Sequence, residues 1–268
     1  MSIKIAIIGG GNLGASIAEG LIKTDLVRPS EIAITRRHPK KIAHLAQKGL
    51  IVSSDNLKVS SQAEIVILAV KPYQAKAVLE EISSGLTEQH IITSVVTGFS
   101  LEHMQQAIGV EKKLALFRAM PNTAIAIQQS MTCIASNDTT WDKTQKVVNI
   151  FDQLGKTVMI DEELMEAATV LGACGIAYAL RFIRAASQGG IEIGFGAETA
   201  NLIAAQTVKG AAALLLENGQ HPEHEIDKVT TPQGCTIAGL NEMEHRGFSS
   251  ALIKGVVTSF KKIDKMKS

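Results

Sequence analysis

Cysteine is scarce in this sequence of 268 residues, which has only Cys133, Cys174 and Cys235. Three cysteines cannot all pair within one chain, and their spacing fits no metal site. We therefore expect neither a disulfide framework nor a bound metal. Cys235 stands beside a predicted helix start, where thiol pKa values fall, but no neighbouring base is evident. We interpret it as a small pocket-lining residue.

An excess of charge is also missing, because 27 Lys and Arg residues balance 26 Asp and Glu residues to a formal net charge of +1. Nucleic acids and anionic membranes attract basic surfaces, so we expect neither as a partner. No basic segment followed by a cleavable apolar core opens the chain, and no apolar run approaches the ~20 residues of a membrane helix. These absences predict a cytoplasmic protein.

What the sequence does contain is an alternation of short β-branched runs with helical patterns. Strands are predicted at 4–9, 31–35, 64–70, 90–96, 113–117, 131–136 and 156–160. Helices are predicted between them at 12–24, 39–49, 74–83, 101–108 and 143–155. This alternation predicts an α/β fold in which right-handed crossovers build a Rossmann-type, doubly wound and mostly parallel sheet.

The pattern changes after Asp161, where the strands stop and long helical patterns begin. We predict a Rossmann dinucleotide-binding domain over residues 1–161 and an all-α domain over residues 162–268. The helical segment 197–219 is apolar on more than one face. That favours burial in a homodimer over the alternative, a central helix of a monomeric bundle.

A GGGNLG motif lies between the first predicted strand and the first predicted helix. In this context Gly9 allows a tight turn, Gly11 lets the backbone approach a pyrophosphate, and Gly14 lets helix and strand pack closely. The amides of Asn12 and Leu13 would face the phosphates from the helix end. The alternative is a glycine-rich turn that binds nothing.

Thr35, Arg36 and Arg37 end the second predicted strand, where an NAD site usually has Asp or Glu to hold the ribose 2′-hydroxyl. The missing carboxylate and the two guanidinium groups favour a 2′-phosphate. We therefore expect NADP(H) as the preferred cofactor, with NAD(H) as the alternative. A solvated basic turn is the other interpretation of these arginines.

Two more segments follow predicted strands, at the edge of the sheet where ligands of such folds bind. We expect cofactor contacts near the ribose and nicotinamide from Ala69, Val70, Lys71 and Pro72, and from Met120 and Asn122.

Residues 230–236, TTPQGCT, precede an amphipathic helical pattern. We expect Thr231 to cap this helix and Pro232 to be its first residue. A helix N-terminus attracts anions, and Gly234 would let the backbone approach a ligand closely. The alternative is a capped helix without a ligand.

Four motifs in this order resemble pyrroline-5-carboxylate reductases, the NAD(P)H-dependent enzymes of the last step in proline biosynthesis. They are GGGNLG at 9–14, AVKPY at 69–73, RAMPNTA at 118–124 and HPEHEIDKVTTPQGCTIAGL at 221–240. The resemblance runs from Ile3 to the final helix. It implies a Rossmann domain joined to a helical dimerisation and substrate-binding domain, in homodimers or higher assemblies of dimers.

The resemblance also implies which residues act. Cofactor contacts carry over to Gly9, Gly11, Asn12, Leu13, Gly14, Arg36, Asn56, Ala69, Val70 and Lys71. Contacts with a small cyclic imino acid carry over to Thr230, Thr231, Gln233, Gly234, Cys235 and Thr236. The implied reaction is hydride transfer from the dihydronicotinamide to a cyclic C=N bond. Thr236 is the candidate catalytic residue, in contact with the ring nitrogen.

Two segments depart from the family's usual residues. G-S-G-P-A-Y is ACGIAY at 173–178, and P-G-G-[TA]-T is PQGCT at 232–236. Both lie where the family builds its substrate pocket, so they bear on substrate preference. His221, His224 and Glu225 form no ligand set, and we interpret them as a solvated turn.

Two other functions remain open. One is a related two-domain reductase acting on another imine or small acid. Hydroxyacid enzymes of that architecture need a catalytic lysine on the interdomain helix, whereas residues 163–194 contain only Arg181 and Arg184 as basic residues. The other is a cofactor-binding regulatory protein without turnover.

Overall fold

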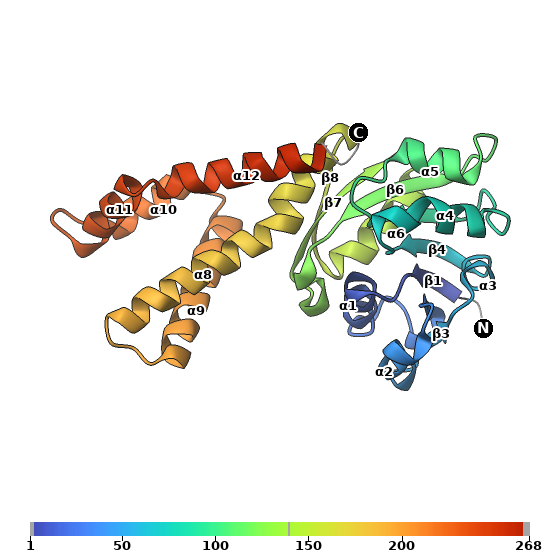
Figure 1. The fold of residues 1–268 in the computed structure, drawn as a ribbon, viewed down its shortest axis with the longest axis horizontal. Helices are drawn as coiled ribbons and strands as arrows, with labels where there is room; N and C mark the ends of the chain where they lie inside the picture. The colour runs from blue at the N-terminus through green and yellow to red at the C-terminus, as the bar shows by residue number, and fades with distance from the viewer. Residues whose placement is uncertain (1–2, 139, 265–268) are drawn as a thin grey trace. The chain divides into compact units, whose positions relative to one another are not determined.

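The structure, a computed structural model, describes residues 3–138 and 140–264. The described chain forms two compact units (Figure 1). Unit 1 comprises the residues up to Cys174 together with those from Phe260 onward, and unit 2 comprises Gly175–Ser259. The predicted domain boundary after Asp161 stays a prediction.

Unit 1 is built on a sheet whose eight described strands follow the order β3-β2-β1-β4-β5-β6-β7-β8. The strands are β1 (Ile3–Ile8), β2 (Ile32–Thr35), β3 (Ile51–Ser53), β4 (Ala63–Leu68), β5 (Ile91–Ser94), β6 (Ala115–Met120), β7 (Ser130–Ser136) and β8 (Gly155–Met159). All neighbouring pairs are parallel except β6 and β7. The predicted Rossmann-type sheet is therefore confirmed.

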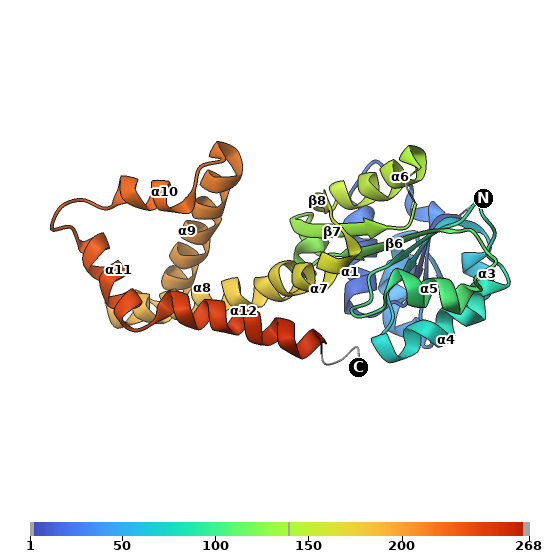
Figure 2. The ribbon, with the colours of Figure 1, turned by 90° about the horizontal axis from the view of Figure 1, so that it is seen from above.

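Helices cover both faces of this sheet because its strand residues alternate between two apolar clusters. The helices of unit 1 are α1 (Asn12–Leu21), α2 (Ala43–Gln47), α3 (Asn56–Ser60), α4 (Pro72–Ser83), α5 (Leu101–Ile108) and α6 (Trp141–Asp152). Ile5 and Ile7 pack in the cluster that contains α1 and α6 residues, whereas Ala6 and Ile8 pack in the cluster of α4 and α5. Figure 2 shows α6 on one side of the sheet and α4 and α5 on the other.

Some elements differ from the sequence prediction. Strand β6 runs through to Met120, although its prediction stopped at Phe117. The next residue, Arg118, is charged, but its two Nη atoms pair with carboxylates inside unit 1, so it can lie in a buried strand. Strand β3 and helix α3 were not predicted, because segments of three and five residues show too little periodicity.

A helical stretch from Glu162 to Cys174 closes unit 1. It begins as the 3₁₀ turn η4 (Glu162–Leu164), continues as α7 (Met165–Ala168) and ends as the π-helical turn η5 (Thr169–Cys174). Met165 is fully buried beside Met120 of β6 and Ala135 of β7. This contact anchors the stretch on the sheet.

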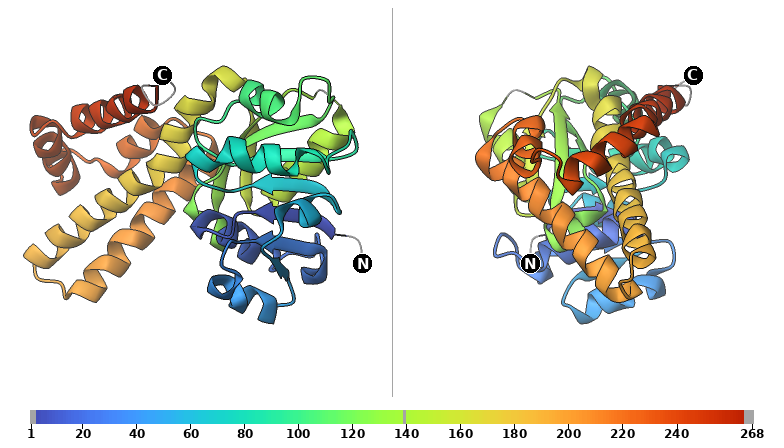
Figure 3. Two further views of the ribbon diagram at one scale, coloured as in Figure 1. Left: turned by 45° about the vertical axis from the view of Figure 1, so that its right-hand side comes forward. Right: turned by 90° about the vertical axis from the view of Figure 1, so that its left-hand side faces the viewer.

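Unit 2 is helical, as predicted. Its helices are α8 (Gly175–Glu192), α9 (Ala197–Asn218), α10 (Pro222–Val229), α11 (Cys235–His245) and α12 (Phe248–Asp264), whose last turn belongs to unit 1. Helices α8 and α9 lie side by side (Figure 3). The hydroxyl groups of Tyr178 and Ser259 are 2.7 Å apart and join α8 to α12.

Most large apolar side chains of unit 2 are exposed. Leu202 and Leu216 of α9 are 68% and 79% exposed, and only Ala200 and Ala204 of that helix are buried. By length and composition alone, the helical stretches Glu162–Glu192 and Ala197–Asn218 could cross a membrane. The expectation that no apolar run approaches the ~20 residues of a membrane helix was therefore wrong. A core helix of a soluble protein meets the same criteria of length and composition.

Helix α10 corrects the interpretation of residues 221–225 as a solvated turn. His221 is its N-cap and accepts a hydrogen bond from the amide of Glu223 through Nδ1, 3.3 Å away. Pro222 is its first residue, where a missing N–H does no harm. Glu225 and Lys228 form an ion pair of 2.7 Å one turn apart, which lowers the pKa of the Glu225 carboxyl.

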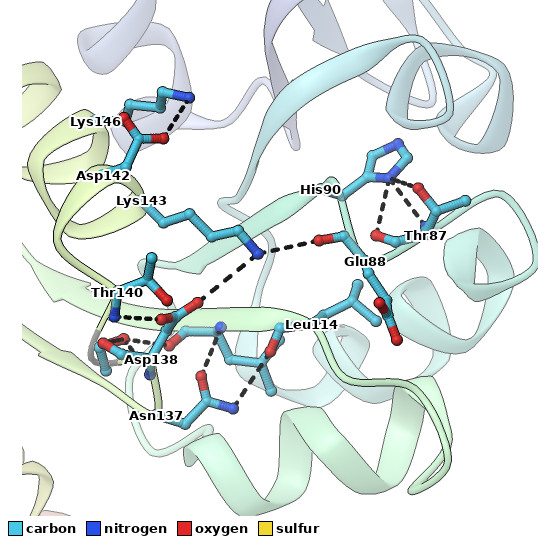
Figure 4. Close-up of polar contacts among 12 residues, drawn as sticks. Thr87, Glu88, His90, Leu114, Asn137, Asp138, Thr140, Asp142, Lys143 and Lys146 are labelled. Carbon is cyan, nitrogen blue, oxygen red and sulfur yellow. Dashed lines mark hydrogen bonds and ion pairs between the residues drawn. The ribbon is translucent and has the colours of Figure 1, made fainter.

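A polar cluster ties the start of β6 to α6 (Figure 4). Asn137 accepts a hydrogen bond from the amide of Leu116 at 2.8 Å, and Lys143 donates to the carbonyl of Glu88 at 3.0 Å. Lys143 also lies 3.8 Å from Asp138. A surface hollow of about 590 Å³ beside this cluster is lined by Trp141, Met159 and other residues. Since β6 starts here, the cluster lies at the sheet edge opposite the strand exits, and we interpret it as structural.

Candidate functional site

The Gly9–Gly14 loop connects β1 to α1, and its glycines differ in how much space surrounds them. Gly9 has φ +112°, and a Cβ there would lie 2.6 Å from the carbonyl oxygen of Ala69. A Cβ on Gly14 would overlap the carbonyl oxygen of Gly9. A Cβ on Gly11, in contrast, would have nothing within 4 Å. Two glycines therefore let the backbones pack, and the space in front of the third is open.

The open space lies at the N-terminus of α1. Gly11 is the N-cap and supplies no side-chain acceptor to the first amides, and Asn12 and Leu13 are the first two helical residues. The amide of Gly10 donates to the carbonyl of Thr35 at 2.6 Å, which holds the loop against the end of β2. Uncapped amides and the helix dipole attract an anion. These residues fit the pyrophosphate of a dinucleotide.

Arg36 follows β2 and reaches over the same loop. Its guanidinium Nη1 donates to the carbonyl of Gly10 at 2.7 Å, and its backbone amide donates to Ser53 at 3.0 Å. Arg37 is exposed. The hydrogen bond to Gly10 fixes the Arg36 guanidinium against the nucleotide loop, Gly9–Gly14, and the predicted contact of Arg36 with a 2′-phosphate stays a prediction.

The predicted cofactor residues Ala69 and Val70, which follow β4, lie against this loop. The amide of Ala69 donates to Ile8 at 2.8 Å, and the Val70 side chain is close to Gly9. Lys71 is the exposed N-cap of α4 and Pro72 its first residue, so β4 ends at Leu68, earlier than predicted. Asn56 opens α3, and its side-chain amide donates to Glu81 of α4 at 3.2 Å.

Asn122 lies just beyond the end of β6. Its side-chain oxygen accepts from the amide of Ala124 at 3.0 Å and caps the 3₁₀ turn η3 (Thr123–Ile127). Its side-chain nitrogen donates to the carbonyl of Gly172 at 3.3 Å. Met120, the last residue of β6, is 4% exposed. The predicted cofactor contacts of Met120 and Asn122 stay predictions.

Sequence reasoning missed the role of Arg118. Its side chain is 2% exposed and lies 3.2 Å from Glu162 and 3.2 Å from Glu166. Glu162 also accepts a hydrogen bond of 2.7 Å from the amide of Leu101. The partners are 44 and 48 residues away along the chain, so no local pattern signalled them.

The loop before α11 differs from its prediction. Helix α11 begins at Cys235 with Gly234 as N-cap, so Thr231 is not a cap and Pro232 is not helical. Thr231 to Gly234 instead form a turn closed by a 2.9 Å hydrogen bond from the amide of Gly234 to the carbonyl of Thr231. Gln233 has φ +63°, a left-handed conformation that no helix can include.

This turn leaves the first amides of α11 without a side-chain cap. A Cβ on Gly234 would lie 2.6 Å from the Thr231 hydroxyl and 3.0 Å from the Thr231 carbonyl oxygen, so a larger residue here would force the Thr231 side chain to move. Cys235 and Thr236, the first two helical residues, are exposed, and Thr230 is half-buried. The six predicted substrate residues thus lie on the turn before α11 and at the start of this helix, whose N-terminus suits a carboxylate.

The other titratable groups offer little chemistry. Within residues 3–138 and 140–264, no three His, Cys, Asp or Glu side chains are arranged to hold a metal ion. Burial raises the pKa of the Cys133 thiol on β7, which disfavours the reactive thiolate. The candidate residues therefore fall into two groups, the nucleotide loop in unit 1 and the N-terminus of α11 in unit 2.

Comparisons with known proteins match these features. Residues 162–266 match the family model for pyrroline-5-carboxylate reductase dimerisation, and residues 4–98 match the model for NADP oxidoreductase, coenzyme F420-dependent. Pyrroline-5-carboxylate reductase 1 of Dictyostelium discoideum is 50% identical over 95% of this chain, which spans about half, 48%, of that longer protein.

Two further proteins are similar over nearly their whole length. Pyrroline-5-carboxylate reductase 2 of Dictyostelium discoideum is 45% identical over 98% of this chain and 92% of its own. The crystal structure of Plasmodium falciparum pyrroline carboxylate reductase with NADP bound has a TM-score of 0.89 and 25% identity, over 99% of this chain and 98% of that one. The two units, the nucleotide loop and these matches together show that the chain belongs to the pyrroline-5-carboxylate reductase family.

Proposed function

We propose that this protein reduces the cyclic imine 1-pyrroline-5-carboxylate to L-proline with NADPH. The observation that carries the proposal is the open space at Gly11, in front of the uncapped N-terminus of α1 and beside Arg36. It supports a dinucleotide site in a chain whose family relatives are named for this reaction.

Bound dihydronicotinamide supplies a hydride, which carries two electrons to the imine carbon. The π electrons of the C=N bond move onto nitrogen, which already carries a proton when the substrate is an iminium ion. The protein therefore needs no strong acid. Its residues bind the two reactants, orient the acceptor carbon and contact the ring N–H.

For the substrate, we propose that the first amides of α11 hold the carboxylate. Gly234 supplies no side chain that would cap these amides. Thr236 follows one residue after the helix start, and its hydroxyl contacts the ring nitrogen. A hydroxyl suits that role because it accepts a hydrogen bond from the iminium and donates one to the product amine.

For the cofactor, we propose a preference for NADPH over NADH. Arg36 is held over the nucleotide loop by the Gly10 carbonyl, and Arg37 adds a second guanidinium, which is exposed. Both would face a 2′-phosphate favourably. Asn56, Ala69, Val70, Lys71, Pro72 and Met120 complete the proposed cofactor contacts.

We also propose that the protein works as a homodimer, or as an assembly of dimers, in the cytoplasm. The apolar side chains exposed on α9 support a partner of the same kind, and this helix lies within the region that matches the dimerisation family. A second copy covering these side chains would remove apolar surface from water.

The test is to follow NADPH absorbance on adding racemic pyrroline-5-carboxylate to the purified chain, with NADH run alongside. A panel of other cyclic imines and 2-oxo acids serves as the control for substrate class. The proposal predicts oxidation with pyrroline-5-carboxylate at a kcat/KM above that of every panel member. Tight NADPH binding without oxidation by any imine would favour a regulatory role and contradict the proposal.

A further inference from the structure

All four polar groups of Asn122 are engaged within unit 1. Its backbone amide donates to the Ser130 hydroxyl at 3.0 Å, and its backbone carbonyl accepts from the amide of Ile125 at 3.1 Å. The side-chain oxygen caps η3 through Ala124. The side-chain nitrogen is the only one of the four that leaves this loop and its neighbouring strand, since it donates to Gly172.

Gly172 lies in the π-helical turn Thr169–Cys174, the last residues of unit 1 before α8. π-Helical turns are rare, and they occur frequently at functional sites. This turn lies against β7, and a Cβ on Gly172 would be in ordinary van der Waals range of the Met131 carbonyl oxygen, at 4.0 Å. The bond from Asn122 therefore reaches a backbone with an uncommon conformation, just where the chain leaves unit 1.

Arg118 supplies a second link between β6 and the same stretch, through Glu162 and Glu166. The two links lie at different positions along β6. Arg118 holds the start of the stretch from within β6, whereas Asn122 holds its end from beyond β6. Only the link from Asn122 lies at the strand exits, where the nicotinamide of a bound dinucleotide would be.

We propose that Asn122 is a positioning residue for hydride transfer. Its side-chain N–H fixes the turn Thr169–Cys174 against the exit of β6, beside the place of the nicotinamide. The inference rests on the proposed function for its catalytic consequence. It differs from the predicted role of Asn122 as a direct cofactor contact, because here the side chain acts through the backbone of Gly172.

The test uses Asn122→Ser and Asn122→Asp. Serine keeps an oxygen that can cap η3 but has no amide to reach Gly172. Aspartate keeps the shape and the cap and replaces the donor with an acceptor. Thr123→Ala, at the exposed neighbouring residue, is the matched control. The measurements are amide hydrogen exchange of the protein without cofactor, the Kd of NADPH by fluorescence, and kcat.

We expect both Asn122 variants to exchange amides of residues 170–176 about tenfold faster than the parent, with α5 unchanged. Their Kd for NADPH stays within about threefold, while kcat falls about tenfold through lost alignment. Thr123→Ala changes none of these. Unchanged exchange in 170–176, or a higher Kd with unchanged exchange, would overturn the proposal. A parent protein that never oxidises NADPH would instead reject the proposed function, because exchange is read without turnover.

Discussion

The Nη2 atom of Arg118 lies 3.2 Å from Oε1 of Glu166, and both side chains are almost fully buried. A second carboxylate, that of Glu162, lies 3.2 Å from Nη1 of the same guanidinium. The Nε atom of Arg118 has no hydrogen-bond partner among the described residues. Two carboxylates thus balance the charge of a guanidinium that water hardly reaches. Removing the guanidinium should therefore lower the free energy of unfolding.

Replacing Arg118 with Met should destabilise the protein by about 3–5 kcal/mol, because it removes the guanidinium that faces the buried carboxylate of Glu166. Urea denaturation measures the loss. The double variant Arg118→Met with Glu166→Leu should recover much of it. Arg246→Met, at an exposed ion pair of 2.8 Å with Glu242, is the control and should change stability by less than about 1 kcal/mol. Equal losses at both sites would contradict the burial argument.

Replacing two glycines of the nucleotide loop with alanine should affect different properties, NADPH binding for Gly11 and stability for Gly14. Gly11→Ala places its methyl group in open space, so the melting temperature should hold while the Kd of NADPH rises about tenfold, or 1.4 kcal/mol. Gly14→Ala forces a methyl group onto the Gly9 carbonyl and should cost about 1–3 kcal/mol of stability. Thermal melts and fluorescence titration of NADPH separate the two effects. An unaltered Kd for Gly11→Ala would remove the pyrophosphate from this loop.

Arg36→Ala should weaken NADPH binding about 10- to 100-fold, the value of one lost charge-assisted contact of about 1.5–3 kcal/mol. The Kd of NADH should change much less, because NADH lacks the 2′-phosphate. Some change in NADH is expected, since the Gly10 carbonyl also loses its donor. The ratio of the two dissociation constants is therefore the measurement. A ratio equal to that of the parent would assign the 2′-phosphate to other groups.

Thr236→Val removes the hydroxyl and keeps the shape of the side chain, so kcat should fall about 10- to 100-fold. Thr236→Ser keeps the hydroxyl and is the matched control, with kcat within a few-fold of the parent. Initial rates at saturating NADPH and substrate provide the comparison. Parental rates in the valine variant would exclude Thr236 from the mechanism.

Gln233→Gly should stabilise the protein by about 0.5–1 kcal/mol. A side chain in the left-handed region costs about 1–2 kcal/mol, and the greater freedom of glycine in the unfolded chain returns part of that gain. Gln128, at φ +59° after η3, gives a second test of the same argument through Gln128→Gly. Denaturation midpoints in urea report both changes. A loss of stability in both variants would show that the two glutamine side chains make contacts that outweigh their strain.

The sheet could be predicted because strand residues such as Ile5 and Ile7 belong to continuous β-branched runs, buried on both faces. The nucleotide loop could be predicted because its glycines obey local rules of turn and packing. The ends of elements were less accessible. Strand β6 continues past its predicted end because Arg118 finds carboxylates far away in sequence, and only the folded chain brings them together.

The region before α11 shows a local failure of a different kind. Thr231 and Pro232 carry a convincing helix-start pattern, yet the turn that they open delays the helix to Cys235. The decisive property is the left-handed backbone of Gln233, a residue type that gives no such signal. Likewise, His221 and Pro222 start helix α10, although the charged residues of this segment indicated a solvated turn.

The contacts of the stretch Glu162–Cys174 determine where two members of this family can be joined in a chimaera. Its contacts with Arg118 and Asn122 keep three positions, 162, 166 and 172, in fixed register with one strand. A helical domain taken from a relative and joined after Asp161 must therefore have carboxylates at positions 162 and 166 and the same spacing to position 172. Without them it cannot form these contacts with the recipient's sheet. A crossover placed after Cys174 keeps the contacts of Arg118 and Asn122 within the recipient protein. We therefore expect exchange of the helical domain to succeed best with a crossover there.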